Sequence, residues 1–161
     1  MILPTEIHEH MEVVGSDGGH VGRVDHVAGG DIELEAFRAE ARAWLEENCP
    51  PSIRNKPGLA LALMDGPPPS GDLALWKQRM GEKGWGTPTW PKEFGGGGLS
   101  RAEARVLAEE MAKIGARNPI GGMGVMMFGP TLLEYGTEAL KRQHMPGIVS
   151  GDVRWCQGYS E

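Results

Sequence analysis

Several features are scarce in this 161-residue sequence, and each scarcity argues against a class of protein. There are only two cysteines, Cys49 and Cys156, which lie far apart with no CxxC spacing, so we expect two reduced thiols rather than a disulfide. No apolar run approaches the roughly 20 residues that span a bilayer. Residues 1–10 lack the basic segment of a signal peptide. We therefore expect a cytoplasmic protein without membrane insertion.

Positive charge is also limited. Sixteen Lys and Arg residues stand against 22 Asp and Glu residues, which gives a formal net charge of −6. The basic residues are scattered among the acidic ones, whereas phosphate neutralisation needs clustered Lys and Arg. A nucleic-acid partner is therefore not expected.

Glycine and proline are abundant, with 25 and 12 residues. They are concentrated at residues 15–22, 50–71, 95–98 and 121–136, between periodic apolar segments. This distribution indicates turns and loops between helices or strands rather than a low-complexity sequence. The 40% hydrophobic and 24% charged contents are those of a globular protein. The length allows one ordinary domain, or one domain with a small appendage.

Residues 12–34 predict a short β hairpin or meander. Val13 and Val14 lead into a glycine-rich turn, spaced valines follow, and Ile32-Glu33-Leu34 alternates in polarity. Two or three strands cannot bury a core by themselves. This segment must therefore pack against another part of the protein.

From Glu35 onward the apolar period becomes helical. Phe37, Ala41, Trp44 and Leu45 form one stripe, and the prolines after Cys49 end that helix. Asp72 is a plausible N-cap of a second helix that ends near Gly84. Ser100 and Glu103 have the spacing of a capping box and predict the start of a third.

The remaining segments predict two further helices and a strand. Residues 123–135 are apolar on nearly all sides and should be buried, and Thr137 caps a short helix through His144. Residues 146–151 are expected to turn the chain into a strand at 153–159 that has no partner, as if the parent protein continued. The expected fold is mainly α, an antiparallel helical bundle over residues 35–150 with these buried side chains: Trp44, Leu107, Met111, Leu132 and Leu133.

Short motifs in this order resemble the N-terminal helical domain of acyl-CoA dehydrogenases, over residues 35–161. They are Gly84-Trp85-Gly86 with Trp90-Pro91-Lys92-Glu93-Phe94-Gly95-Gly96, Gly129-Pro130-Thr131-Leu132-Leu133 with Tyr135-Gly136-Thr137-Glu138, Met145-Pro146-Gly147-Ile148, and Cys156-Gln157-Gly158-Tyr159-Ser160-Glu161. The last motif is similar to the opening of the family's middle β domain. The resemblance divides the chain into residues 1–34, 35–151 and 152–161.

The resemblance implies an FAD-dependent oxidoreductase that desaturates acyl-CoA thioesters between the α and β carbons. The family's catalytic base usually lies in a C-terminal domain, so no catalytic residue is assigned here, and the chain alone should be inactive. Electron-transfer flavoprotein or a similar acceptor would be the redox partner. The parent enzyme would be a homo- or hetero-oligomer.

The resemblance also implies site residues. Gln157, Tyr159 and Ser160 would lie by the flavin ring, and Ser160 would also touch the acyl thioester. Met123, Met126 and Met127 would line the acyl-chain cavity, a role that suits methionine because it fills irregular apolar spaces.

Other interpretations stay open. The first 34 residues resemble half of a PRC-barrel-like β domain, so either the protein is a natural fusion or the frame joins two unrelated pieces. The unpaired edges of a half barrel favour the second explanation. No metal is expected, because His8, His10, His20 and His26 match no zinc spacing. Two rival functions remain, namely a free-standing helical protein-interaction module and a small β binding domain with a helical passenger.

Overall fold

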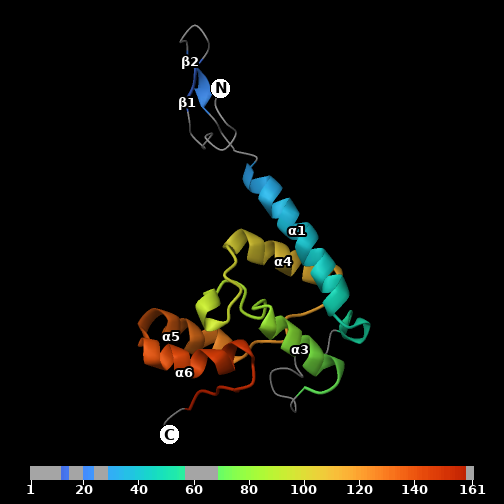
Figure 1. Cartoon of the computed structure of the whole chain (residues 1–161), viewed down its shortest axis with the longest axis vertical. Coiled ribbons are helices and arrows are strands. Elements are labelled where there is room, and N and C mark those ends of the chain that lie inside the picture. The colour runs from blue at the N-terminus through green and yellow to red at the C-terminus, as the bar shows by residue number, and fades with distance from the viewer. Residues whose placement is uncertain (1–11, 15–19, 24–28, 57–68, 159–161) are drawn as a thin grey trace.

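The computed structural model describes residues 12–14, 20–23, 29–56 and 69–158, and it is mainly helical. Two short strands, β1 (Glu12–Val14) and β2 (His20–Arg23), pair antiparallel, with Glu12 opposite Arg23 and an irregularity between Val13 and Val14. Figure 1 shows them beyond the N-terminal end of the first helix, α1 (Gly29–Asn48).

Helix α1 begins six residues earlier than the predicted start at Glu35, so the strand expected at Ile32–Leu34 is wrong. Leu34 is half-buried and lies three residues before Phe37, so it continues the helical stripe. An alternation over only three residues fits both periods and cannot distinguish a strand from a helix. The predicted division between residues 34 and 35 consequently falls inside α1.

The next elements are a 3₁₀ turn η2 (Pro51–Ile53), α3 (Asp72–Glu82), a 3₁₀ turn η3 (Lys92–Phe94) and α4 (Arg101–Lys113). Asp72 is the first residue of α3 rather than its N-cap, which is Gly71. The predicted capping box of α4 is confirmed. The backbone N–H of Glu103 donates to Ser100 Oγ at 3.2 Å, and the N–H of Ser100 donates to the Glu103 carboxylate at 2.8 Å.

A first core lies between α1, α3, α4 and the loop around Trp85. Leu107 and Met111 are buried as predicted, whereas Trp44 is half-buried and packs edge-on against Trp85 with 4.8 Å between ring centroids. The other fully buried members are Ala41, Leu45, Cys49, Trp76 and Met80. Both cysteines are free, and burial raises the pKa of the Cys49 thiol.

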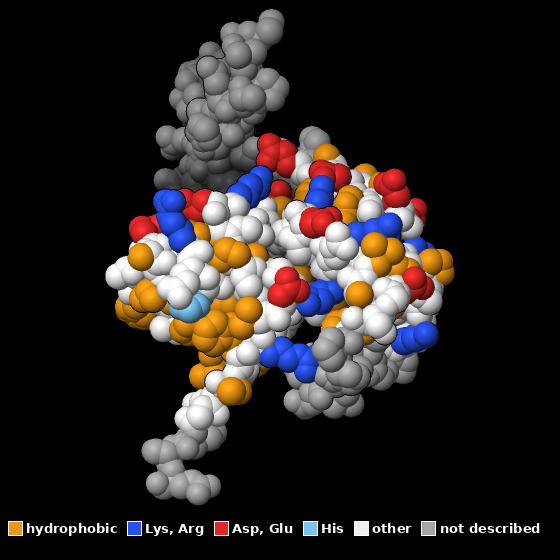
Figure 2. All heavy atoms as spheres, turned by 60° about the horizontal axis from the view of Figure 1, so that its bottom comes forward, with side chains coloured by type: hydrophobic (Ala, Val, Ile, Leu, Met, Phe, Trp, Pro, Cys, Tyr) orange, Lys and Arg blue, Asp and Glu red, His pale blue; other side chains and the backbone are white. Residues whose placement is uncertain are grey.

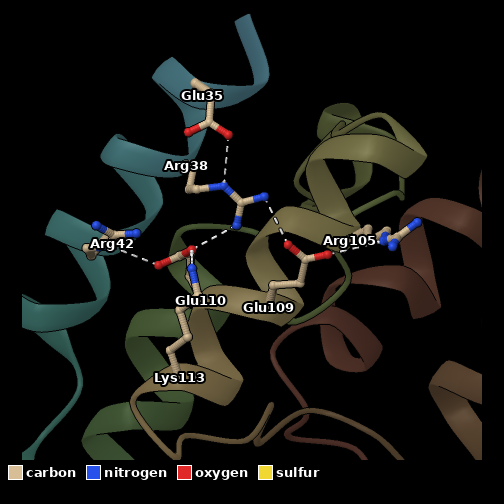
Figure 3. A network of polar contacts seen from close by, with 7 residues as sticks. All are labelled: Glu35, Arg38, Arg42, Arg105, Glu109, Glu110 and Lys113. Atoms are coloured by element: carbon tan, nitrogen blue, oxygen red, sulfur yellow. Dashed lines mark hydrogen bonds and ion pairs between the residues drawn. The ribbon is translucent and has the colours of Figure 1, made fainter. Parts of the chain in front are cut away.

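One carboxylate is buried where α1 crosses α4. The Glu110 side chain is only 2% exposed and accepts hydrogen bonds of 2.9 Å from both Arg38 and Arg42, and another from Lys113 (Figure 3). Arg38 also reaches Glu109 at 2.9 Å. These ion pairs tie the two helices together.

The C-terminal part contains a π-helical turn η4 (Gly124–Phe128), which runs into α5 (Gly129–Tyr135), and then α6 (Glu138–Val149). Thr137 caps α6 as predicted, because its hydroxyl accepts from the N–H of Leu140. The turn expected from Pro146 is wrong, because α6 continues through Pro146 to Val149. Burial of Met145, Ile148 and Val149 on one face favours helix there despite the missing proline N–H.

A second core holds these helices together. Leu132 is buried as predicted and Leu133 is half-buried, and both pack with Met145 and Ile148. After α6, residues 152–158 contain no strand, although one was expected at 153–159. A strand needs a neighbour to complete its backbone hydrogen bonds. No helix among the described residues is long and apolar enough to cross a membrane.

Candidate functional site

Large apolar side chains are exposed along η4 and α5, where the sequence predicted a fully buried helix. Met126 is 66% exposed, Met127 is 50% exposed and Tyr135 is 77% exposed, so that prediction is wrong for this face. Met123, at the start of η4, is half-buried. We call the exposed side chains of Met126 and Met127 the methionine face. Figure 2 shows apolar side chains gathered near the point where the C-terminal segment leaves the helical body.

The π turn sets which residues point outward. The N–H of Gly129 donates to the carbonyl of Gly124, five residues back, so these two glycines lie one turn apart on the inner side. Met126 and Met127 then point outward. A wider turn of this kind often occurs at functional sites.

Both glycines are required by close approach of a tryptophan. A Cβ at Gly129 would lie 2.1 Å from Cη2 of Trp90, and one at Gly124 would lie 2.6 Å from Cδ1 of Trp155. Non-bonded carbon atoms do not approach so closely. The inner side of η4 is therefore shaped to receive two indole rings.

Trp155 packs in a small aromatic cluster. Its ring centroid lies 4.1 Å from that of Phe128 and 5.5 Å from that of His144. The predicted flavin-edge residue Gln157 follows two positions later, and its side chain is exposed. Tyr159 and Ser160, predicted for the same edge, lie outside the described residues.

The segment that leads to Gln157 thus packs, through Trp155, against the π turn that carries Met126 and Met127. Phe128, His144 and Trp155 were not among the site residues predicted individually from the sequence. A signal was available, because glycines five residues apart in an apolar helix indicate close approach of a bulky neighbour. The local sequence does not indicate which residue that bulky neighbour is.

The side chains that form the methionine face are apolar and exposed. The Tyr135 phenol has a raised pKa because it hydrogen-bonds Glu134. In the described part of the chain, no three His, Cys, Asp or Glu side chains gather to hold a metal ion. The methionine face can therefore contact an apolar group.

A separate hollow of about 690 Å³ lies between α3 and the turn after α6. Lys77 and Asp152 line it and form an ion pair of 2.9 Å, which lowers the pKa of the Asp152 carboxyl. Of the predicted site residues that the structure describes, namely Met123, Met126, Met127 and Gln157, none lines this hollow.

The model of the acyl-CoA dehydrogenase N-terminal domain family matches residues 31–152. This chain belongs to the acyl-CoA dehydrogenase family. A second model, of an uncharacterized protein family conserved in bacteria (DUF2171), matches residues 7–45. The two matches overlap within α1.

Curated relatives agree with this assignment. The chain is 36% identical over 134 residues to acyl-CoA dehydrogenase IpdE1 of Mycolicibacterium smegmatis, a match that covers 81% of this chain and 33% of that protein. It is 39% identical over 83 residues to acyl-CoA dehydrogenase FadE26 of Mycobacterium tuberculosis, over 52% of this chain and 20% of that one. The chain thus spans about a third or less of the length of these relatives.

Solved structures show the same fold. The Tcur3481-Tcur3483 steroid acyl-CoA dehydrogenase is 35% identical, with a TM-score of 0.56 over 76% of this chain and 30% of that one. The ChsE4-ChsE5 complex from Mycobacterium tuberculosis is 30% identical, with a TM-score of 0.53 over 80% of this chain and 30% of that one.

Proposed function

We propose that this chain is the N-terminal helical part of an FAD-dependent acyl-CoA dehydrogenase, which desaturates an acyl-CoA thioester between its α and β carbons. The chain would supply a wall of the acyl pocket and one edge of the flavin site. The observation that carries this proposal is the exposed methionine face, which lies on the π turn against which the segment leading to Gln157 packs through Trp155.

The chemistry of the face suits an acyl chain. Met126 and Met127 expose unbranched, polarizable side chains that can adapt to irregular apolar ligands. Each methylene buried against them would contribute about 0.8 kcal/mol. Met123 would border the same pocket at the start of η4.

The residues present fit only the ring end of a flavin. The exposed Gln157 amide can both donate to and accept from the polar edge of an isoalloxazine ring. Tyr159 and Ser160 stay predicted neighbours of that ring, and Ser160 of the thioester. Bound FAD would accept the two electrons that leave the acyl chain, and the base that removes the α proton would come from another domain.

Two of the similar solved structures suggest a narrower substrate class and an assembly for this protein. Since a steroid acyl-CoA dehydrogenase and a two-protein complex are 35% and 30% identical to this chain, we propose a steroid-derived acyl-CoA and a hetero-oligomer. Electron-transfer flavoprotein or a similar acceptor would reoxidise the flavin.

A chimera tests the proposal. The matching third of IpdE1 is replaced by residues 31–158 of this chain, and the purified protein is assayed for visible flavin absorbance and for acyl-CoA-dependent dye reduction. We expect a yellow protein that is active on the acyl-CoA esters used by IpdE1. A folded, colourless chimera would contradict the proposal.

The chain alone provides the complementary test. Residues 1–161 should neither bind FAD tightly nor reduce a dye with any acyl-CoA. The exposed apolar face is also consistent with a free-standing protein-interaction module. An open reading frame after the Glu161 codon that encodes Pro-Gly-Ala-Gly-Ser-Asp would favour the dehydrogenase, and an immediate stop codon would favour the module.

A further inference from the structure

The contacts of Trp155 join two parts of the proposed site. Its ring lies on the bare backbone of Gly124, with Phe128 and His144 on its other sides. We call these three residues the tryptophan seat. Two of them belong to η4, the turn that also carries Met126 and Met127, and the third belongs to α6.

The segment around Trp155 has no regular secondary structure to hold it in place. The N–H of Val153 donates to the carbonyl of Gly147 at 3.1 Å, and Asp152 pairs with Lys77, so the start of the segment is fixed to α6 and α3. Trp155, in the later part of the segment, packs against the second core. Gln157 lies only two residues beyond.

The fit of the indole is steric rather than polar. Its Nε1–H is buried and finds no acceptor in the described part of the chain. The ring centroid is 4.1 Å from Phe128, and the ring crosses His144 at 82°. Shape and aromatic contacts therefore position the ring.

We propose that Trp155 is a positioning residue. Its ring, packed in the tryptophan seat, holds the segment that leads to Gln157 against the helix that carries Met126 and Met127. Its consequence at the flavin rests on the function proposed above, whereas the seat itself rests on the contacts alone. If the Trp155 ring shifted, Gln157 and the proposed flavin contacts would move relative to Met126 and Met127, which would line the acyl pocket.

Limited proteolysis of the full chain tests the seat without any cofactor. Trypsin cleaves after Arg154, directly beside the seated ring, and cleavage after Arg117 and Arg142 serves as an internal reference. Gly124→Ala places a methyl group where the ring lies and should raise cleavage after Arg154 about tenfold, by local opening of this segment alone. Gly121→Ala is the matched control, because a Cβ at Gly121 meets no atom within 4 Å.

A double-mutant cycle separates this effect from a general loss of stability. Trp155→Ala should also raise cleavage after Arg154, and Gly124→Ala should add little once the ring is gone, because both act on one contact. Trp155→Phe keeps an aromatic ring and should retain most of the protection. Additive effects, or cleavage that rises equally at all three arginines in both single variants, would overturn the proposal.

The same variants in the IpdE1 chimera test the consequence. Gly124→Ala should shift the flavin absorbance spectrum and lower kcat, while Gly121→Ala should leave both unchanged. A parent chimera that binds no flavin counts against the proposed function, and the proteolysis result still decides the seat. Selective opening at Arg154 with an unchanged flavin spectrum would overturn the positioning role.

Discussion

The Glu110 carboxylate has an unusual position for a charged residue, because it is 2% exposed between two helices. The hydrogen bond from Arg42, together with those from Lys113 and Arg38, lowers the pKa of Glu110 to about 2. A lowered folded-state pKa adds stability above the ordinary value of 4.5, and that stability is lost as the pH falls toward 2. Acid should therefore weaken the ion pairs that hold α1 against α4.

Replacing this carboxylate should weaken the protein at neutral pH. Glu110→Gln leaves Arg38 and Arg42 without a negative partner, and we expect a loss of roughly 2–3 kcal/mol in the free energy of unfolding. The unfolding free energy of the variant should also fall less steeply between about pH 5 and pH 2. Urea titrations at several pH values measure both effects.

Glu47→Gln is the matched control, since Glu47 lies exposed on α1. It should change the unfolding free energy by less than about 0.5 kcal/mol. Equal acid sensitivity of Glu110→Gln and the unmodified chain would show that the network does not stabilise the fold.

At the methionine face, Met126→Phe should change substrate preference in the chimera. A rigid ring in place of a pliable chain should lower kcat/KM for the bulkier of two acyl-CoA esters by about tenfold relative to the smaller. Leu75→Phe, on an exposed apolar residue of α3, is the control. If both variants leave the ratio unchanged, Met126 does not line the pocket.

Among the helices, α4 has the best-defined beginning. Ser100→Ala removes one half of its capping box and should cost about 1 kcal/mol, or about 2–4 °C in Tm for a chain of this size. Ser70→Ala, at an exposed position outside any helix, should change Tm by less than 1 °C or so. Calorimetry of both variants checks this, and equal melting temperatures would contradict the capping role.

The capping box, the Thr137 cap and the end of α1 could all be predicted, because each depends on a few adjacent residues. The path of α6 through Pro146 could not, because burial of Met145 and Ile148 outweighs the local proline signal. The expected strand after α6 depends on a partner strand, and residues 152–158 pair with none among the residues that the structure describes. Long-range contacts decided both cases.

The site shows the same division. The family resemblance drew attention to Met126, Met127 and Gln157, but periodicity alone predicted that the first two would be buried. The π turn changes the direction in which successive side chains point around the helix axis. One side of the apolar run at residues 123–135, which the helical period predicted to be buried, is exposed. The packing of Trp155 could not be predicted from the sequence, since its seat is formed by residues about 10 to 30 positions away.

At the scale of the whole molecule, the N-terminal strands and the helices are joined through α1. β1 and β2 contact chiefly each other, so deleting residues 1–28 should change Tm by no more than about 4 °C. Deleting residues 1–40 also removes Phe37 and Arg38 and should lower Tm much further. A drop of more than about 8 °C for the shorter deletion would indicate that the strands support the helical body.

The exposure of Met126 and Met127 makes their thioethers open to oxidation. Peroxide converts an accessible methionine to its sulfoxide, so these two should be oxidised well before the fully buried Met80 and Met145. Any domain, subunit or acyl group that covers the face would shield the same two sulfur atoms. Mass spectrometry can follow the order in which the methionines are oxidised. Slower oxidation of Met126 and Met127 would therefore show that another group covers this face.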